Sequence, residues 1–68
     1  MKPSDKANYF GAPEAIIPCP GKYNIWIQLD RVLSLVTYNT KQEAVTALRD
    51  NYIGGVVYGP TGRPVYAK

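Results

Sequence analysis

Apolar and polar residues alternate strictly over the stretch YNIWIQL, residues 23–29. One side carries Tyr23, Ile25, Ile27 and Leu29, and the other carries Asn24, Trp26 and Gln28. After Asp30-Arg31, residues 32–38 are again mostly apolar or β-branched. Period-two alternation is typical of a half-buried strand, so the two runs predict a β-hairpin.

The register of this hairpin depends on the length of its turn. A two-residue turn at Asp30-Arg31 pairs Leu29 with Val32 and Tyr23 with Tyr38. A three-residue turn instead moves Leu33 and Leu35 into the core. The absence of glycine favours the shorter turn. The predicted core face then carries Tyr23, Ile25, Ile27, Leu29, Val32, Val36 and Tyr38.

A helix is expected to follow. Thr40-Lys41-Gln42-Glu43 has the form of a capping box, with a hydroxyl at the start and a carboxylate three residues later. Apolar residues then recur at helical spacing, at Ala44, Val45, Ala47, Leu48 and Tyr52. We expect Gly54-Gly55 to end this helix, and its apolar stripe to cover one face of the hairpin.

The last segment predicts a second hairpin. Gly59-Pro60-Thr61-Gly62 suits a type I turn with a left-handed glycine, and Pro64 places the returning strand at a sheet edge. Ala15-Ile16-Ile17 is long enough for a short edge strand, and residues 18–21 must turn. The predicted fold is α+β: a small antiparallel sheet of 3–5 strands with one helix on one face, in the order β(β)-α-β(β). Residues 1–14 are expected to be a flexible or docked tail, and 15–68 a single domain.

Composition narrows the chemistry. The 68 residues include one cysteine and no histidine, which argues against a disulfide scaffold, a multi-cysteine zinc site and histidine-based catalysis. The five carboxylates are isolated along the sequence. We therefore expect no catalytic residues, no metal and no cofactor. No apolar run is long enough to span a membrane and the first residues lack a secretory pattern, so a cytoplasmic location is expected.

The hairpin face opposite the predicted core is unusually apolar. It carries Trp26, Leu33 and Leu35 among polar neighbours, which is more apolar surface than a solvated face requires. These three residues are the predicted partner-binding site, with Tyr9 and Phe10 as possible extensions. The alternative is that the N-terminal segment itself covers Trp26, through Tyr9, Phe10, Ile16 and Ile17.

The positive net charge leaves nucleic-acid binding open as a second interpretation. The formal net charge is +3 and the pI is near 9.2, but no two basic residues are adjacent. Folding could still gather cations beside aromatic side chains that stack on bases. The candidate residues for nucleic-acid binding are Lys22, Arg31, Lys41, Arg63, Tyr58 and Tyr66.

Two resemblances bear on these alternatives. The hairpin with Trp26 followed by Thr-Lys-Gln-Glu-Ala at 40–44 resembles the arm-type DNA-binding domains of phage integrases, which implies DNA reading by the sheet. The order of residues 23–57, with Thr40, Glu43, Ala44, Tyr52 and Gly55, is similar to small phage proteins that inhibit host RNA polymerase.

The sequence therefore predicts a small non-catalytic protein-binding module, an inhibitor or adaptor of phage-like type that occludes a partner's surface. One alternative is a DNA- or RNA-binding sheet. The other is a self-associating module, a homodimer formed through the Pro64 edge and the Trp26 face.

Overall fold

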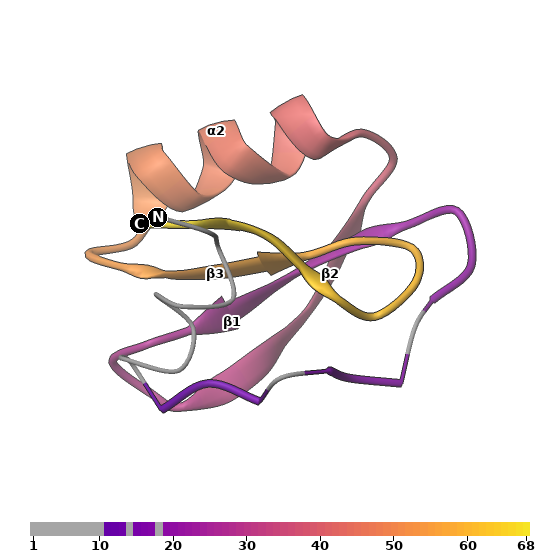
Figure 1. The fold of residues 1–68 in the computed structure, drawn as a ribbon. Coiled ribbons are helices and arrows are strands. Elements are labelled where there is room, and N and C mark those ends of the chain that lie inside the picture. The colour runs from indigo at the N-terminus through magenta and orange to yellow at the C-terminus, as the bar shows by residue number, and fades with distance from the viewer. Residues whose placement is uncertain (1–10, 14, 18) are drawn as a thin grey trace.

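The computed structural model describes residues 11–13, 15–17 and 19–68. The described elements are β1 (Tyr23–Ile27), β2 (Val32–Tyr38), α2 (Lys41–Asn51), β3 (Gly55–Tyr58) and β4 (Pro64–Ala67). The strands form one antiparallel sheet of four strands, and α2 lies against it (Figure 1). The predicted α+β class and the order β-β-α-β-β are confirmed.

The strand order in the sheet is β2-β1-β3-β4. The chain leaves β2 at one edge, passes through α2 and returns as β3 on the far side of β1. This crossover places the helix over the two central strands. β2 and β4 are the two edges, so the position predicted for the strand that contains Pro64 is confirmed.

The first hairpin departs from its predicted register. Tyr23 pairs with Tyr38 as expected, but Val32 pairs with Ile27, so the connecting loop has four residues, 28–31. Arg31 closes this loop with a left-handed φ of 54° and donates its backbone N–H to the Ile27 carbonyl over 2.8 Å. The two-residue turn is therefore wrong, because a non-glycine residue takes the left-handed position that the longer loop needs.

A β-bulge in β2 reconciles the two ends of this hairpin. Asn24 pairs with Thr37 and Trp26 with Leu33, so one residue of β1 faces three residues of β2. The predicted core face is wrong for Leu29, Val32 and Val36, all of which are exposed. Leu29 lies in the four-residue loop and not in a strand, and Val32 and Val36 lie in β2, which is an edge strand of the sheet.

The helix begins as predicted. Thr40 is the N-cap, and its hydroxyl oxygen accepts a hydrogen bond from the Glu43 backbone N–H over 3.2 Å. The helix ends at Asn51, before the two glycines, and its C-cap Tyr52 has an extended backbone. The expectation that Gly54-Gly55 stops the helix is wrong.

Lys68 and Gly55 determine the structure at the C-terminal end of α2 and at the start of β3. The Lys68 ammonium donates to the carbonyls of Arg49 and Tyr52, each over 3.1 Å, and so satisfies acceptors that the last helical turn leaves open. Gly55 starts β3 so close to β1 that a Cβ there would lie 2.2 Å from the Trp26 carbonyl oxygen. This glycine is required by the close approach of two strands and not by a helix cap.

The second hairpin has the predicted turn. Gly62 donates its N–H to the Gly59 carbonyl over 2.9 Å, and Gly59 donates to the Arg63 carbonyl over 2.8 Å. Gly62 has a φ of 82°, the left-handed value of a G1 bulge after a type I turn.

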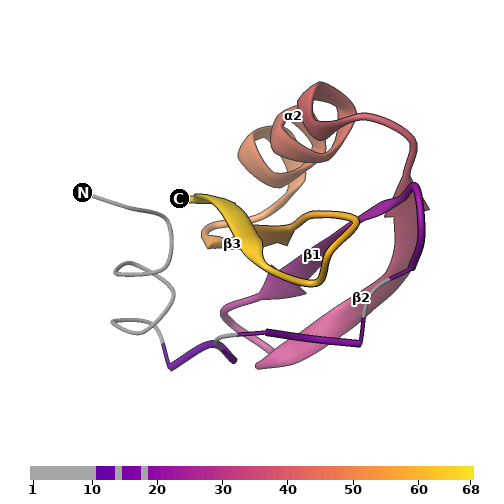
Figure 2. The same cartoon turned by 45° about the vertical axis from the view of Figure 1, so that its right-hand side comes forward.

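Each face of the sheet has its own cluster of buried residues. On the helix side, Ile25 and Val57 pack with Ala44 and Leu48 of α2. On the other side, the described residues that cover the sheet are not helical. This side is covered by residues 11–13, 15–17 and 19–22, which we call the strap, and its buried cluster is Ala12, Trp26, Val56 and Tyr58. Figure 2 shows α2 and the purple strap on opposite sides of the sheet.

The strap is irregular in structure. The edge strand predicted at Ala15-Ile16-Ile17 is wrong, because these residues have no strand geometry. Ile16 makes one backbone hydrogen bond, to the Gly62 carbonyl over 2.8 Å. The predicted turn is present, with Lys22 N–H bonded to the Cys19 carbonyl over 2.9 Å. Within the described part of the chain, no helix has the length and apolar character needed to cross a bilayer.

Candidate protein-binding surface

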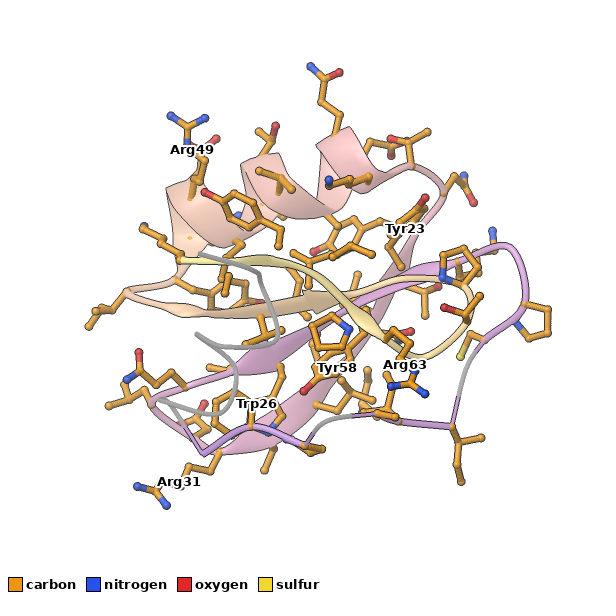
Figure 3. The ribbon with its side chains drawn as sticks, in the orientation of Figure 1. Tyr23, Trp26, Arg31, Arg49, Tyr58 and Arg63 are labelled. Carbon is orange, nitrogen blue, oxygen red and sulfur yellow. The ribbon has the colours of Figure 1, made fainter. Side chains whose placement is uncertain are left out.

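Trp26 is not part of an exposed surface. Its side chain is 5% exposed and packs with Ala12, Val56 and Tyr58, with Ile16 and Leu33 around them. Figure 3 shows Trp26 and Tyr58 between the sheet and the strap. The expectation that Trp26 is exposed on this face is wrong, because the N-terminal segment covers the indole ring.

The residues that cover Trp26 differ in part from those that the alternative interpretation of the sequence predicts. Ile16 packs against the Trp26 cluster, but Ile17 is almost fully exposed. Ala12 lies in the cluster although the sequence offers no signal for it. Tyr9 and Phe10 lie outside the described residues, as does most of the predicted tail.

Two polar groups lie within this strap-covered face. The Tyr58 hydroxyl donates a hydrogen bond to the Pro13 carbonyl and so joins the strap to β3. Burial raises the pKa of Tyr58 to about 12. The Asn24 side chain is also buried, and its Oδ1 has no hydrogen-bond partner among the described residues. This face is therefore packed, but less completely satisfied than a regular interface between a helix and a sheet.

Leu33 and Leu35 differ in burial, although the sequence predicts both on the same face as Trp26. Leu33 pairs with Trp26 and packs, half-buried, against the same cluster. Leu35 lies within the β2 bulge and its side chain is 100% exposed. Of the five predicted partner-binding residues, Leu35 alone is shown as an accessible apolar side chain.

The residues around Leu35 extend this apolar surface. Val36 is 55% exposed and Val32 is 51% exposed, and both lie on the same edge strand. The seven residues of β2 include no charged residue and no proline. We call Val32, Leu35 and Val36 the β2-edge patch. Its two valines were assigned to the core by the predicted register, so sequence reasoning missed them.

The bulge determines how this patch can make contacts. The Val36 backbone N–H already bonds to the Ser34 hydroxyl oxygen over 3.2 Å. The outer edge of β2 therefore lacks the continuous row of free backbone groups that an added strand needs. Contact through the β2-edge patch must rely on its apolar side chains.

A second exposed apolar site lies at the end of the sheet. Leu29 and Ile53 are both mostly exposed and, with Gln28, Arg31 and Gly54, line a hollow of about 360 Å³. It joins the β1–β2 loop to the loop between α2 and β3, where Gln28 N–H bonds to the Gly54 carbonyl over 3.2 Å.

The two tyrosines predicted for nucleic-acid binding are wholly or partly buried. Tyr58 is fully buried, and Tyr66 is partly buried and packs against the helix-side cluster. Arg31 and Arg63 point away from different parts of the fold (Figure 3). Lys22 donates to the Asn39 side-chain oxygen, and Lys41 is the first residue of α2. The Tyr58 ring is therefore not accessible for base stacking in this fold.

Two observations concern the titratable side chains of the described residues. No group of three or more histidine, cysteine or acidic residues is placed to hold a metal ion among the residues that the structure describes. Tyr38 has a raised pKa, because of its burial first and the neighbouring Tyr52 second. Both tyrosines with a raised pKa are neutral hydrogen-bonding groups near pH 7 and neither is activated as a base or nucleophile.

Comparison with protein-family models, with curated proteins and with solved structures finds no match to this chain.

Proposed function

We propose that this protein is a small non-catalytic protein-binding module, an inhibitor or adaptor that occludes a surface of its partner through the β2-edge patch. The observation that carries the proposal is the full exposure of Leu35 in an uncharged edge strand. The phage-like character suggested by its helix and hairpin is part of the same proposal.

The physical argument is one of unburied apolar area. A leucine side chain contributes about 1.5–3 kcal/mol when it moves from water into an apolar site. Leu35 contributes none of this within the fold, although Leu33, two residues earlier, does pack against the core. Scattered single apolar residues are normal on a surface, but β2 exposes three of them within residues 32–36 and has no charged residue.

The patch favours a partner with an apolar pocket. Because the bulge interrupts the backbone edge, an added strand from a partner would gain few main-chain hydrogen bonds. A pocket in the partner that receives Leu35, with Val36 and Val32 at its rim, would bury these side chains without main-chain hydrogen bonds.

Site-specific photocrosslinking tests this proposal. Thr37, exposed in β2 beside the patch, is replaced by benzoylphenylalanine, and the full chain is irradiated in a lysate of its source cells. The control carries the same group at Thr46, which is exposed on α2. We expect one discrete adduct with another protein from the β2 position and none from the helix.

Competition establishes that the adduct depends on the patch. Excess unlabelled wild-type protein and the Ile17→Asp variant should both suppress the adduct, because Ile17 is exposed on the strap and lies outside β2. Leu35→Asp should not suppress it, because a carboxylate does not enter an apolar pocket. Equal suppression by Leu35→Asp, or equal labelling from the helix, would overturn the proposal.

A further inference from the structure

The strap covers the sheet with few buried side chains. Among its described residues, Ala12 alone is buried, Ile16 and Cys19 are half-buried, and the others are exposed. On the opposite face, α2 buries Ala44 and Leu48 completely. The strap therefore gains much less from apolar burial than the helix does.

The strap is also joined to the sheet by few hydrogen bonds. Its described residues take part in none of the strand pairings of the sheet. Two hydrogen bonds join it to the second hairpin, from the Ile16 N–H to the Gly62 carbonyl and from the Tyr58 hydroxyl to the Pro13 carbonyl. The strap precedes β1 in the chain, so it can leave the sheet without breaking any strand pairing.

A buried polar atom opposes the closed position of the strap. Asn24 is 3% exposed, and its Oδ1 has no hydrogen-bond partner among the described residues. Asn24 pairs with Tyr58 across β1 and β3, which places both side chains on the strap face. A buried acceptor without a partner costs free energy, and this cost is relieved when water reaches the atom.

We propose that the strap opens as a unit while the sheet and α2 stay folded, so that Trp26, Val56 and Tyr58 become accessible to solvent in a minor state. Opening of a weakly packed segment requires less free energy than unfolding of the whole domain. The inference concerns a different surface from the β2-edge patch and does not rest on the proposed function.

The base of the strap provides a hinge for this motion. Gly21 has a left-handed φ of 74°, and no atom lies within 4 Å of the position that a Cβ would take there. The backbone can therefore change direction at Gly21 without a steric clash. The next residue, Lys22, donates to the Asn39 side chain, and this contact can persist while the rest of the strap moves.

Two neighbouring valines provide a matched test. Val56 and Val57 are both fully buried in β3, but Val56 lies in the strap-side cluster and Val57 in the helix-side cluster. Each is replaced by cysteine, a small apolar residue, in a Cys19→Ser background. The rate of reaction with a thiol reagent is divided by the rate for the same chain unfolded in urea. We expect this ratio to be at least about tenfold higher for Val56→Cys than for Val57→Cys.

The dependence on urea identifies the kind of opening. Local opening exposes little surface, so labelling of Val56→Cys should depend weakly on urea at low concentrations. Labelling of Val57→Cys requires unfolding of the sheet and helix, so it should depend on urea as steeply as global unfolding does.

Substitutions in the strap show whether its contacts control the opening. Ile16→Ala removes an apolar contact with the strap-side cluster and should speed the labelling of Val56→Cys by at least about fivefold, with no change for Val57→Cys. Ile17→Ala is the control, because Ile17 is 92% exposed, and it should change neither rate.

Hydrogen exchange tests the same opening in the wild-type chain. The Ile16 N–H should exchange with a smaller opening free energy than the N–H groups in the middle of α2. Equal labelling ratios for the two cysteines with the same urea dependence would overturn the inference. An Ile16 N–H as strongly protected as those of α2, or equal acceleration of both cysteines by Ile16→Ala, would also overturn it.

Discussion

The two faces of the sheet are covered by different kinds of structure. The helix face has a capped helix of eleven residues whose buried Ala44 and Leu48 meet Ile25 and Val57. The other face has an irregular strap, joined to the sheet by the hydrogen bonds of Ile16 and of the Pro13 carbonyl. The comparison shows that a small sheet can bury one face against a helix and the other against an irregular segment.

Trp26→Ala should have the largest effect, since it removes the largest side chain from the strap face. We expect the free energy of unfolding to fall by about 4 kcal/mol, because truncation of a buried tryptophan loses its transfer energy and leaves a cavity. Urea unfolding measures this loss. A variant that unfolds at the wild-type denaturant concentration would show that the strap does not cover the indole ring in solution.

Leu48→Ala is the matching change on the helix face. The side chain is fully buried between α2 and the sheet, and we expect a loss of about 3 kcal/mol. Urea unfolding of the two variants side by side compares the faces directly. A loss from Leu48→Ala well above that from Trp26→Ala would mean that the helix face holds most of the stability.

Thr40→Ala tests how much the N-cap of α2 contributes to stability, and it leaves the residues of both buried clusters unchanged. The variant loses the hydroxyl that accepts the Glu43 N–H, and we expect a cost of about 1 kcal/mol. Thr40→Ser keeps the hydroxyl and is the control. Both variants are measured by thermal unfolding, and equal midpoints for alanine and serine would contradict a capping role.

Tyr58→Phe tests the strap cover in the same way and has the smallest expected effect. It removes the hydroxyl bonded to the Pro13 carbonyl, at a cost of about 0.5 kcal/mol near neutral pH. Native-state hydrogen exchange should show faster exchange of the Ile16 N–H and little change for the helix amides. Unchanged exchange at Ile16 would mean that this hydrogen bond does not hold the strap.

The same variant gives a pH test. Burial raises the pKa of Tyr58 from 10.0 to about 12, so the folded protein keeps a proton that the unfolded chain releases. The free energy of unfolding of the wild type should therefore fall as pH rises from 10 toward 12. Tyr58→Phe has no such proton and should lose less stability over that range. Parallel slopes for the two proteins in urea unfolding would contradict a buried hydroxyl.

Local patterns predicted the elements that depend on local physics. The Thr40 cap, the turn that ends at Gly62 and the edge position of Pro64 each follow from the chemistry of one or two residues, and all three are present. The alternation around Trp26 also holds, because Ile25 and Trp26 lie in the clusters of opposite faces.

Which residues are exposed depends on long-range contacts that local sequence patterns do not determine. The left-handed Arg31 and the bulge in β2 together shifted the hairpin, which exposed two valines assigned to the core. The strap covers Trp26 through Ile16, which the alternative interpretation of the sequence included, and through Ala12, which has no periodic neighbour to indicate its burial. Leu35 is the predicted contact residue that the structure leaves fully exposed, and it lies in the edge strand β2.

The loop between β3 and β4 has a consequence for engineering this protein as a display scaffold. Gly62 closes the hairpin with its N–H and receives the Ile16 N–H at its carbonyl, so one short loop holds two parts of the molecule. A peptide inserted there would loosen the cover over Trp26 as well as the hairpin. The loop at residues 28–31, whose Leu29 and Asp30 already face solvent, is the better site for grafted sequences.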